Sequence, residues 1–213
     1  MMNYEQFLDL LKSRRSIRRF TDRAVGREDI VRLLEAARWA PSNHNRQPWK
    51  FLVLEDRTQI RALAETIGRS LAKKIKSLPA VASAYAGELA HYSTVFANAP
   101  VLIVVLHKPP ASVAAPLLEG LPHPELVSGE PLSVAMAAQN LLLAAQTLEL
   151  GTCVLTGPLL VQEEFTDTLN LPAGFGLTCF IAVGHPAESP ESPRRKSLEN
   201  IAEFRNDAPN NNP

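Results

Sequence analysis

A cluster of arginines near the start of the chain is the feature with the clearest chemical meaning. Residues 14–20 read Arg-Arg-Ser-Ile-Arg-Arg-Phe, so four arginines and a serine fall within six positions. In an extended segment alternate side chains share a side, which would place Arg14, Ser16 and Arg18 together. Guanidinium and hydroxyl donors in such an array suit a phosphate monoester, which accepts several charge-assisted hydrogen bonds. A solvated basic turn is the alternative that composition alone leaves open.

Residues suited to other catalytic chemistries form no recognisable pattern. The sequence has no GxGxxG after a predicted strand, no GxxxxGK phosphate loop, no HExxH and no GxSxG. The five histidines are scattered, and the two cysteines, Cys153 and Cys179, lie in apolar runs without metal-ligand spacing. We expect both thiols to be buried as small hydrophobic groups. These patterns argue against a hydrolase, a kinase or a metal site.

Composition sets the broad class of protein. The chain has 213 residues, of which 46% are hydrophobic and 21% charged, and its formal net charge is zero. A neutral chain has no overall attraction to nucleic acid or to anionic lipid. The amino terminus is acidic, and no apolar run approaches the ~18 residues that span a bilayer. We therefore expect a cytoplasmic globular protein with neither a nucleic-acid partner nor a membrane attachment.

The hydrophobic pattern predicts the elements that would position these residues. Asn3 followed by Gln6 has the spacing of a helix cap, and apolar residues repeat at helical spacing after it. Residues 101–106 are apolar throughout, which indicates a strand that is buried on both faces. Further helices are predicted over residues 27–40, 56–78, 133–150 (apolar on most faces) and 161–170, and further strands over 49–54, 152–156 and 177–184.

Two stretches lack such periodicity. Residues 109–131 contain six prolines and are interpreted as a surface excursion or lid. The tail from Pro186 onward has little core material and would either fray or lie along a partner subunit. Helices and strands alternate irregularly, which favours an α+β or mixed α/β fold in three layers over a doubly wound sheet. We predict a single domain over residues 1–205 and a disordered end over 206–213.

Three segments, taken in order, resemble the nitroreductase family of flavin enzymes. They are the arginine cluster at 14–20, Ala-Pro-Ser-Asn-His-Asn-Arg-Gln-Pro-Trp at 40–49, and Gly-Thr-Cys-Val-Leu-Thr-Gly-Pro at 151–158. A fourth similarity is Val-Gly-His-Pro-Ala-Glu at 183–188, followed by a basic run at 194–196. The resemblance implies an α+β three-layer sandwich with a mixed, mostly antiparallel sheet. It also implies an intertwined homodimer that encloses one FMN at each end of its interface.

The resemblance further implies which residues hold the cofactor. Arg14, Ser16 and Arg18 would bind the FMN phosphate and ribityl end, and Arg15 would assist through its backbone. Thr156 and Gly157 would place backbone along the flavin edge near N5. The other implied contacts are the late basic pair Arg195 and Lys196 at the phosphate, and Pro41, Ser42, Asn43 and Asn45 from the other subunit.

From the residues alone, some of these positions have simpler explanations. Asparagines before a Gln-Pro-Trp stretch could form a turn, and a basic tail could be merely solvated. The segment 90–96, which precedes the central strand, shows no contact that the resemblance can assign. The acceptor and the choice between NADH and NADPH are equally open.

By resemblance, the protein would pass hydride from NADH or NADPH through flavin N5 to a nitroaromatic, a quinone or a similar electron-poor acceptor. One shared pocket implies ping-pong kinetics. Arg18 would act as a fixed positive charge near N1 and O2 of the ring, and no side chain is assigned as acid or base. Alternatives within the fold are an enone reductase, a dehalogenase-like enzyme or a flavin-consuming enzyme. A non-catalytic anion-binding protein is a further alternative.

Overall fold

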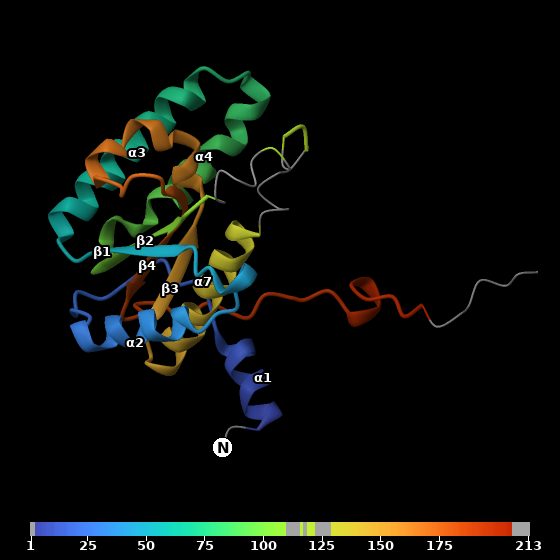
Figure 1. Ribbon diagram of the computed structural model, residues 1–213. Coiled ribbons are helices and arrows are strands. Elements are labelled where there is room, and N and C mark those ends of the chain that lie inside the picture. The colour runs from blue at the N-terminus through green and yellow to red at the C-terminus, as the bar shows by residue number, and fades with distance from the viewer. Residues whose placement is uncertain (1–2, 110–115, 117–118, 122–128, 206–213) are drawn as a thin grey trace, which may run out of the picture.

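Figure 1 shows the computed structural model of the chain, which describes residues 3–109, 116, 119–121 and 129–205. Most of the proline-rich stretch 109–131 and the whole of 206–213 lie outside these residues. The lid, the disordered end and the domain boundary at 205 therefore stay predictions. The body of the chain is a sheet between two layers of helices, and α1 and the carboxyl-terminal tail project from that body (Figure 1).

A four-stranded antiparallel sheet forms the middle layer. Its order is β1 (Trp49–Leu54), β2 (Val101–His107), β4 (Gly176–Gly184) and β3 (Gly151–Leu155). Every strand boundary lies within one residue of its prediction. The apolar run at 101–106 is buried along its whole length, as expected for an inner strand.

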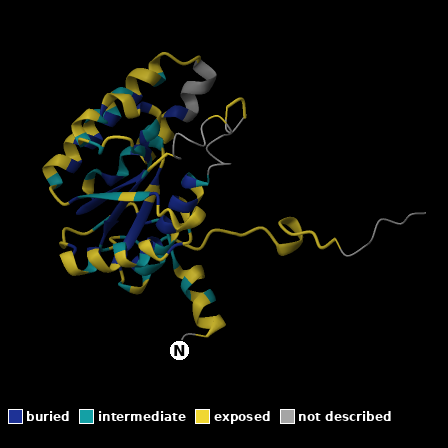
Figure 2. Ribbon diagram, in the orientation of Figure 1, coloured by how far each residue is buried: buried dark blue, intermediate teal, exposed yellow. Residues whose placement is uncertain are grey.

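Successive side chains of β2 enter two separate cores, because neighbouring residues of a strand point to opposite faces. Residues 101, 103 and 105 pack beneath α2 (Arg27–Arg38) and α7 (Glu130–Thr147). Residues 102, 104 and 106 pack beneath α3 (Arg57–Lys76) on the other face. In Figure 2 the buried sheet lies between helices whose outer surfaces are exposed. The predicted three-layer α+β fold is confirmed.

The first helix, α1 (Tyr4–Ser13), begins at the predicted cap. Asn3 Oδ1 accepts a hydrogen bond from the Gln6 N–H at 2.9 Å, and Gln6 Oε1 accepts one from the Asn3 N–H at 3.0 Å. None of the helix residues is buried, and Tyr4 is 71% exposed. The apolar face of α1 is thus largely uncovered by the described residues of its own chain.

The helix α7 begins earlier than predicted, at Glu130, with Pro131 in its first turn. A proline fits there because the first helical N–H groups have no intrahelical partner. Its predicted burial on several sides is only partly right. Leu132 is 51% exposed and Met136 is 41% exposed, so one apolar stripe of α7 faces outward.

The helix predicted over 161–170 is wrong. The chain forms two 3₁₀ segments there, η4 (Gly157–Glu164) and η5 (Asp167–Leu169). Pro158 lacks an N–H group, and Val161 adopts φ −133° and ψ 28°, which interrupts any regular helix.

A helix that the sequence does not predict, α4 (Ala80–Thr94), follows α3 on the same face of the sheet. Its segment is rich in alanine and serine and has no apolar stripe at helical spacing. The end of α4, with the 3₁₀ segment η2 (Val95–Asn98), accounts for residues 90–96.

The arginine segment lies along the outer edge of β3. Ser16 forms an isolated parallel bridge with Thr152, and the Ile17 N–H donates to the Thr152 carbonyl at 2.9 Å. Ile17 is 6% exposed and packs directly over Gly151. A Cβ atom at position 151 would lie 2.8 Å from Ile17 side-chain atoms, so a glycine is needed for this close approach.

We expect Gly151→Ala to lower the free energy of unfolding by about 1–3 kcal/mol, because it overpacks the contact between β3 and the arginine segment. The control is Gly87→Ala in α4, where an added Cβ would meet no atom within 4 Å. That change should stabilise the protein by up to ~1 kcal/mol through helix propensity. Denaturant unfolding measures both values, and equal effects from the two substitutions would contradict the packing argument.

Candidate functional site

The arginine segment separates its side chains into two sets, as an extended chain should. On one side Ile17 is buried, Arg15 donates to the carbonyl of Lys12, and Arg19 forms an ion pair with Glu188 at 3.6 Å. The other set is Arg14, Ser16 and Arg18. Within the part of the chain that the structure describes, their side chains make no hydrogen bond and no ion pair.

Arg18 contacts α4 instead of an acidic group. Its guanidinium carbon lies 5.0 Å from the centroid of the Tyr92 ring, a cation–π contact. Arg18 also borders a cavity of about 400 Å³ that it shares with Arg57 and Arg61 of α3. Arg57 is paired with Asp22 at 2.9 Å, and the positive charge of the cavity walls exceeds the negative charge. Solvent or an anionic ligand must therefore satisfy the remaining donors.

The charges that act on the Cys153 thiol of β3 show that Arg14 and Arg18 both lie near this strand. Burial raises the pKa of the Cys153 thiol, and the positive charges of Arg18 and Arg14 partly oppose that shift. Burial also raises the pKa of Cys179, to about 12. Both thiols are free and buried, so the prediction of two buried cysteines is confirmed. Among the described residues, no cluster of His, Cys, Asp or Glu could hold a metal ion.

Glu188 fixes the backbone of the arginine segment. Its Oε1 accepts hydrogen bonds from the N–H groups of Arg18, at 2.5 Å, and Arg19, at 3.1 Å. The Ala187 N–H donates to the Arg19 carbonyl at 2.9 Å, and Phe20 bridges Pro186. The start of the carboxyl-terminal tail thus holds residues 18–21 beyond the point where the pairing of the segment with β3 ends. Residues 183–188, which resemble the family, therefore position the arginine segment, a role that the sequence did not suggest.

Thr156 and Gly157 come directly after β3 and lie beside the end of α4. A Cβ atom at position 157 would overlap the hydroxyl of Ser93, which is 2% exposed. Only a glycine allows this turn to contact α4 so closely. Tyr92 and Ser93 thus join the site, one against Arg18 and one against Gly157. No pattern in the sequence indicates these two residues, because α4 lacks a periodic apolar stripe.

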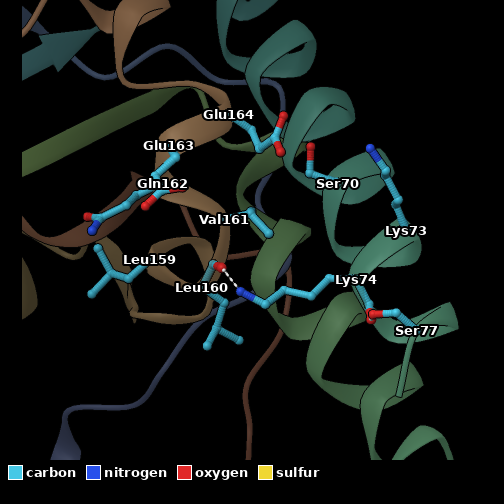
Figure 3. Close-up of a pocket in the computed structure, with 10 residues that line it drawn as sticks. All are labelled: Ser70, Lys73, Lys74, Ser77, Leu159, Leu160, Val161, Gln162, Glu163 and Glu164. Atoms are coloured by element: carbon cyan, nitrogen blue, oxygen red, sulfur yellow. Dashed lines mark hydrogen bonds between the residues drawn. The ribbon is translucent and has the colours of Figure 1, made fainter. Parts of the chain in front are cut away.

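A groove of about 350 Å³ behind this turn separates α3 from η4 (Figure 3). Lysines of α3 face glutamates of η4 across it. Lys74 Nζ donates to the Leu160 carbonyl at 2.8 Å, which satisfies a backbone group that the irregular 3₁₀ segment exposes. The contact of Lys74 therefore supports the segment that follows the turn at Gly157.

The second predicted group, Pro41, Ser42, Asn43 and Asn45, lies elsewhere in the chain, beside the start of α7 (Figure 1). The Asn43 N–H donates to Ser133 Oγ at 3.3 Å, and the Gln47 N–H donates to Ser42 Oγ at 3.0 Å. No hydrogen bond between described residues joins this group to the arginine segment.

The backbone of this second group is strained. His44, Asn45 and Gln47 have φ values of 49°, 53° and 48°, and residues other than glycine rarely adopt such backbone angles. Such strain is concentrated at ligand and active sites. It favours a binding role for the segment over simple turn chemistry.

The late basic pair, Arg195 and Lys196, lies in the exposed tail that leaves the body of the chain (Figure 2). The structure of one chain does not bring these residues to Arg14 or Ser16. Their predicted contact with the same phosphate therefore has no support within one chain and stays a prediction.

Comparison with known proteins identifies the family. The model of the Nitroreductase family matches residues 11–185, which include the arginine segment, the second group and β3. The chain belongs to this family, and the predicted family and its oxidoreductase class are confirmed. None of the helices formed by the described residues has the length and apolar character needed to cross a bilayer.

Several relatives are similar over most of their length. A protein of Archaeoglobus fulgidus, provisionally named an NADH dehydrogenase/NAD(P)H nitroreductase, is 29% identical over 86% of this chain and 87% of its own. The iodotyrosine deiodinase of Thermotoga neapolitana is 28% identical over 89% of this chain and 94% of its own.

Solved structures agree with the fold. A BluB-like flavoprotein of Clostridium difficile has a TM-score of 0.80 and 26% identity, over 93% of this chain and 98% of its own. An iodotyrosine deiodinase bound to FMN and 3-iodo-L-tyrosine has a TM-score of 0.70 and 25% identity, over 94% of this chain and 98% of its own.

We expect Glu188→Ala to lower the free energy of unfolding by about 2 kcal/mol, because two backbone N–H groups lose a charged acceptor. Denaturant unfolding measures the loss, and hydrogen exchange should accelerate at the amides of residues 18 and 19. Glu191→Ala removes an exposed carboxylate of the same tail and is the matched control. Unchanged exchange at residues 18 and 19 in the Glu188 variant would contradict the anchoring role.

Proposed function

We propose that the protein is an FMN-dependent NAD(P)H oxidoreductase. The observation that carries this proposal is the set of partner-free donors on one side of the arginine segment. Arg14 is only partly exposed, yet its guanidinium has no anionic partner among the described residues. A guanidinium group in that position, next to the Ser16 hydroxyl and the Arg18 guanidinium, fits the phosphate and ribityl end of FMN. Homologous structures that contain FMN support the choice of ligand.

The remaining residues of the site suit a flat ring. The backbone after β3, at Thr156 and Gly157, would lie along the ring edge, and Tyr92 would hold Arg18 in place through the cation–π contact. When bound, FMN supplies the hydride-transfer chemistry. Arg18 supplies a fixed positive charge that stabilises electron density on the pyrimidine side of the ring. No side chain is required as a proton donor.

We propose further that two copies of the chain complete each site. The segment at 41–45, which contains the strained His44 and Asn45, is held against α7 and not against the arginine segment in its own chain, so it would reach the flavin of a second copy. The uncovered apolar faces of α1 and α7 support this arrangement, because a monomer rarely exposes so much contiguous apolar surface. The tail also carries Leu198, Ile201 and Phe204, which are 75%, 64% and 88% exposed and would lie against the partner.

The proposed acceptors are nitroaromatics, quinones and similar electron-poor compounds, reduced in a ping-pong cycle with NADH or NADPH. Reductive dehalogenation is the second candidate, because iodotyrosine deiodinases are among the relatives and the solved structures. Destruction of the flavin itself is a third, given the BluB-like neighbour.

The test begins with the colour of the purified protein and the mass of the released flavin. Anaerobic reduction of the bound flavin by each nicotinamide follows, and then reoxidation by a nitroaromatic, a quinone or 3-iodotyrosine. Loss of flavin mass in air would identify the third candidate. Colourless protein that fails to bind added FMN would contradict the whole proposal.

We expect Arg18→Ala to weaken FMN binding roughly tenfold, the equivalent of about 1.4 kcal/mol, and to slow flavin reduction. Removal of the fixed charge is the physical reason for both effects. Arg23→Ala, at an exposed arginine outside the segment, is the matched control and should behave as wild type. Fluorescence titration of released FMN and stopped-flow reduction give the two quantities. Equal flavin affinity and rate in both variants would rule out the role of Arg18.

We expect Met136→Glu to dissociate the dimer, because the carboxylate would be buried in the proposed interface on α7. Val31→Glu on α2 is the control, since Val31 is 56% exposed on a helix that we do not place in the interface. Light scattering after size-exclusion chromatography measures the mass of each variant. A wild-type protein that is monomeric at micromolar concentration would refute the shared site.

A further inference from the structure

A second cavity has a volume of about 290 Å³. It lies at one end of the sheet, where β2 ends, whereas Glu188 holds the arginine segment at the opposite end. Its described walls come from the end of β2, the start of α7 and the loop that follows the second group. The lining residues are Arg46, Pro48, Lys108, Pro109 and Glu130. The functional assignment above uses none of these side chains.

Glu130 is the unusual member of this set, because it is a buried and half-satisfied carboxylate. Its side chain is 2% exposed, and Oε1 accepts a hydrogen bond from Arg46 Nη1 at 2.9 Å. The other oxygen, Oε2, is buried and has no hydrogen-bond partner. A buried carboxylate oxygen without a donor is strongly unfavourable in a folded protein. A ligand that brings an O–H or N–H group would remove this penalty.

The other charges of the cavity define what else the ligand carries. Lys108 makes no ion pair with any described residue, so Arg46, Lys108 and Glu130 together leave one positive charge in excess. His107 lies next to them, but burial lowers its pKa, with Glu130 opposing the shift in part, and its Nδ1 is 2.9 Å from Thr178 Oγ1. The imidazole therefore adds no charge at neutral pH. The walls fit a ligand with a hydrogen-bond donor next to an anionic group.

We infer that this cavity binds a ribose phosphate unit of the nicotinamide dinucleotide. A ribose hydroxyl would donate to Glu130 Oε2, and the adjoining phosphate would lie against Arg46 and Lys108. Carboxylates are common acceptors for ribose hydroxyls, and paired cations suit phosphate oxygens. A simple anion would leave Glu130 Oε2 without a hydrogen-bond donor, and a simple cation would be repelled by the two basic side chains.

The location of the cavity agrees with this assignment. Arg46 directly follows the segment at 41–45, which is proposed to reach the flavin of a second copy. A dinucleotide held here would extend along that segment toward the ring. The inference rests on the proposed function for the identity of the dinucleotide, but the chemistry of the cavity stands on the walls alone.

ADP-ribose is the probe, because it carries ribose hydroxyls and phosphates but cannot reduce a flavin. Calorimetry on the FMN-loaded protein should detect binding, and Glu130→Gln and Lys108→Met should each weaken it at least fivefold. Lys108 is exposed, so its variant tests the site even if Glu130→Gln folds poorly. The matched controls are Glu65→Gln and Lys76→Met on the outer surface of α3, which should bind as wild type does.

A second readout separates this inference from the proposed function. In stopped-flow reduction the KM for NADH should rise at least fivefold in both cavity variants. Normal flavin reduction with an unchanged KM would overturn the cavity assignment and leave the oxidoreductase proposal intact. If the protein fails to bind flavin but still binds ADP-ribose through Glu130 and Lys108, the oxidoreductase proposal is overturned and the cavity assignment stands. Absence of ADP-ribose binding to the wild type would overturn the inference outright.

Discussion

The backbone pairing between the arginine segment and the edge of β3 is the constraint on which the site depends. β3 ends the sheet, so its outer edge would otherwise present unpaired backbone groups. The hydrogen bond from Ile17 to Thr152 covers this edge, and Gly151 lets the Ile17 side chain pack inward. Once Ile17 points inward, alternation turns Arg14, Ser16 and Arg18 toward the side where the protein offers no acceptor. One register of pairing therefore creates both the fold contact and the proposed anion site.

The same constraint explains why one chain would hold only part of the proposed flavin site. The arginine segment is fixed between β3 and Glu188, whereas the strained residues 43–47 are fixed against the start of α7. Neither group can move to the other without breaking the hydrogen bonds that define it. The cofactor assignment and the dimer assignment are thus one hypothesis, because each group lacks the other within a single chain. The uncovered apolar stripe belongs to α7, the helix against which Asn43 of the second group is held.

The sequence predicts the elements that depend on local residue patterns. It does not predict the elements and contacts that depend on tertiary packing. All four strands follow from apolar runs, and the cap at Asn3 follows from its spacing with Gln6. The 3₁₀ segment at 157–164 does not follow from local rules, because the chain kinks at Val161 and the Leu160 carbonyl is satisfied by Lys74 of a helix distant in sequence. Tyr92 and Ser93 enter the site through contacts with Arg18 and Gly157 that no pattern within α4 indicates. The role of Glu188 likewise depends on a pairing across about 170 residues of sequence.

Satisfied and unsatisfied polar groups separate structural clusters from binding clusters in this chain. Arg57 has Asp22, and Lys74 has the Leu160 carbonyl, so both are explained by folding alone. Glu130 is different, because burial of an ion pair is often no more stabilising than apolar residues of the same size. A carboxylate that is buried with one oxygen unpaired is less favourable still. Its presence beside a cavity is more readily explained by what it binds than by what it holds together.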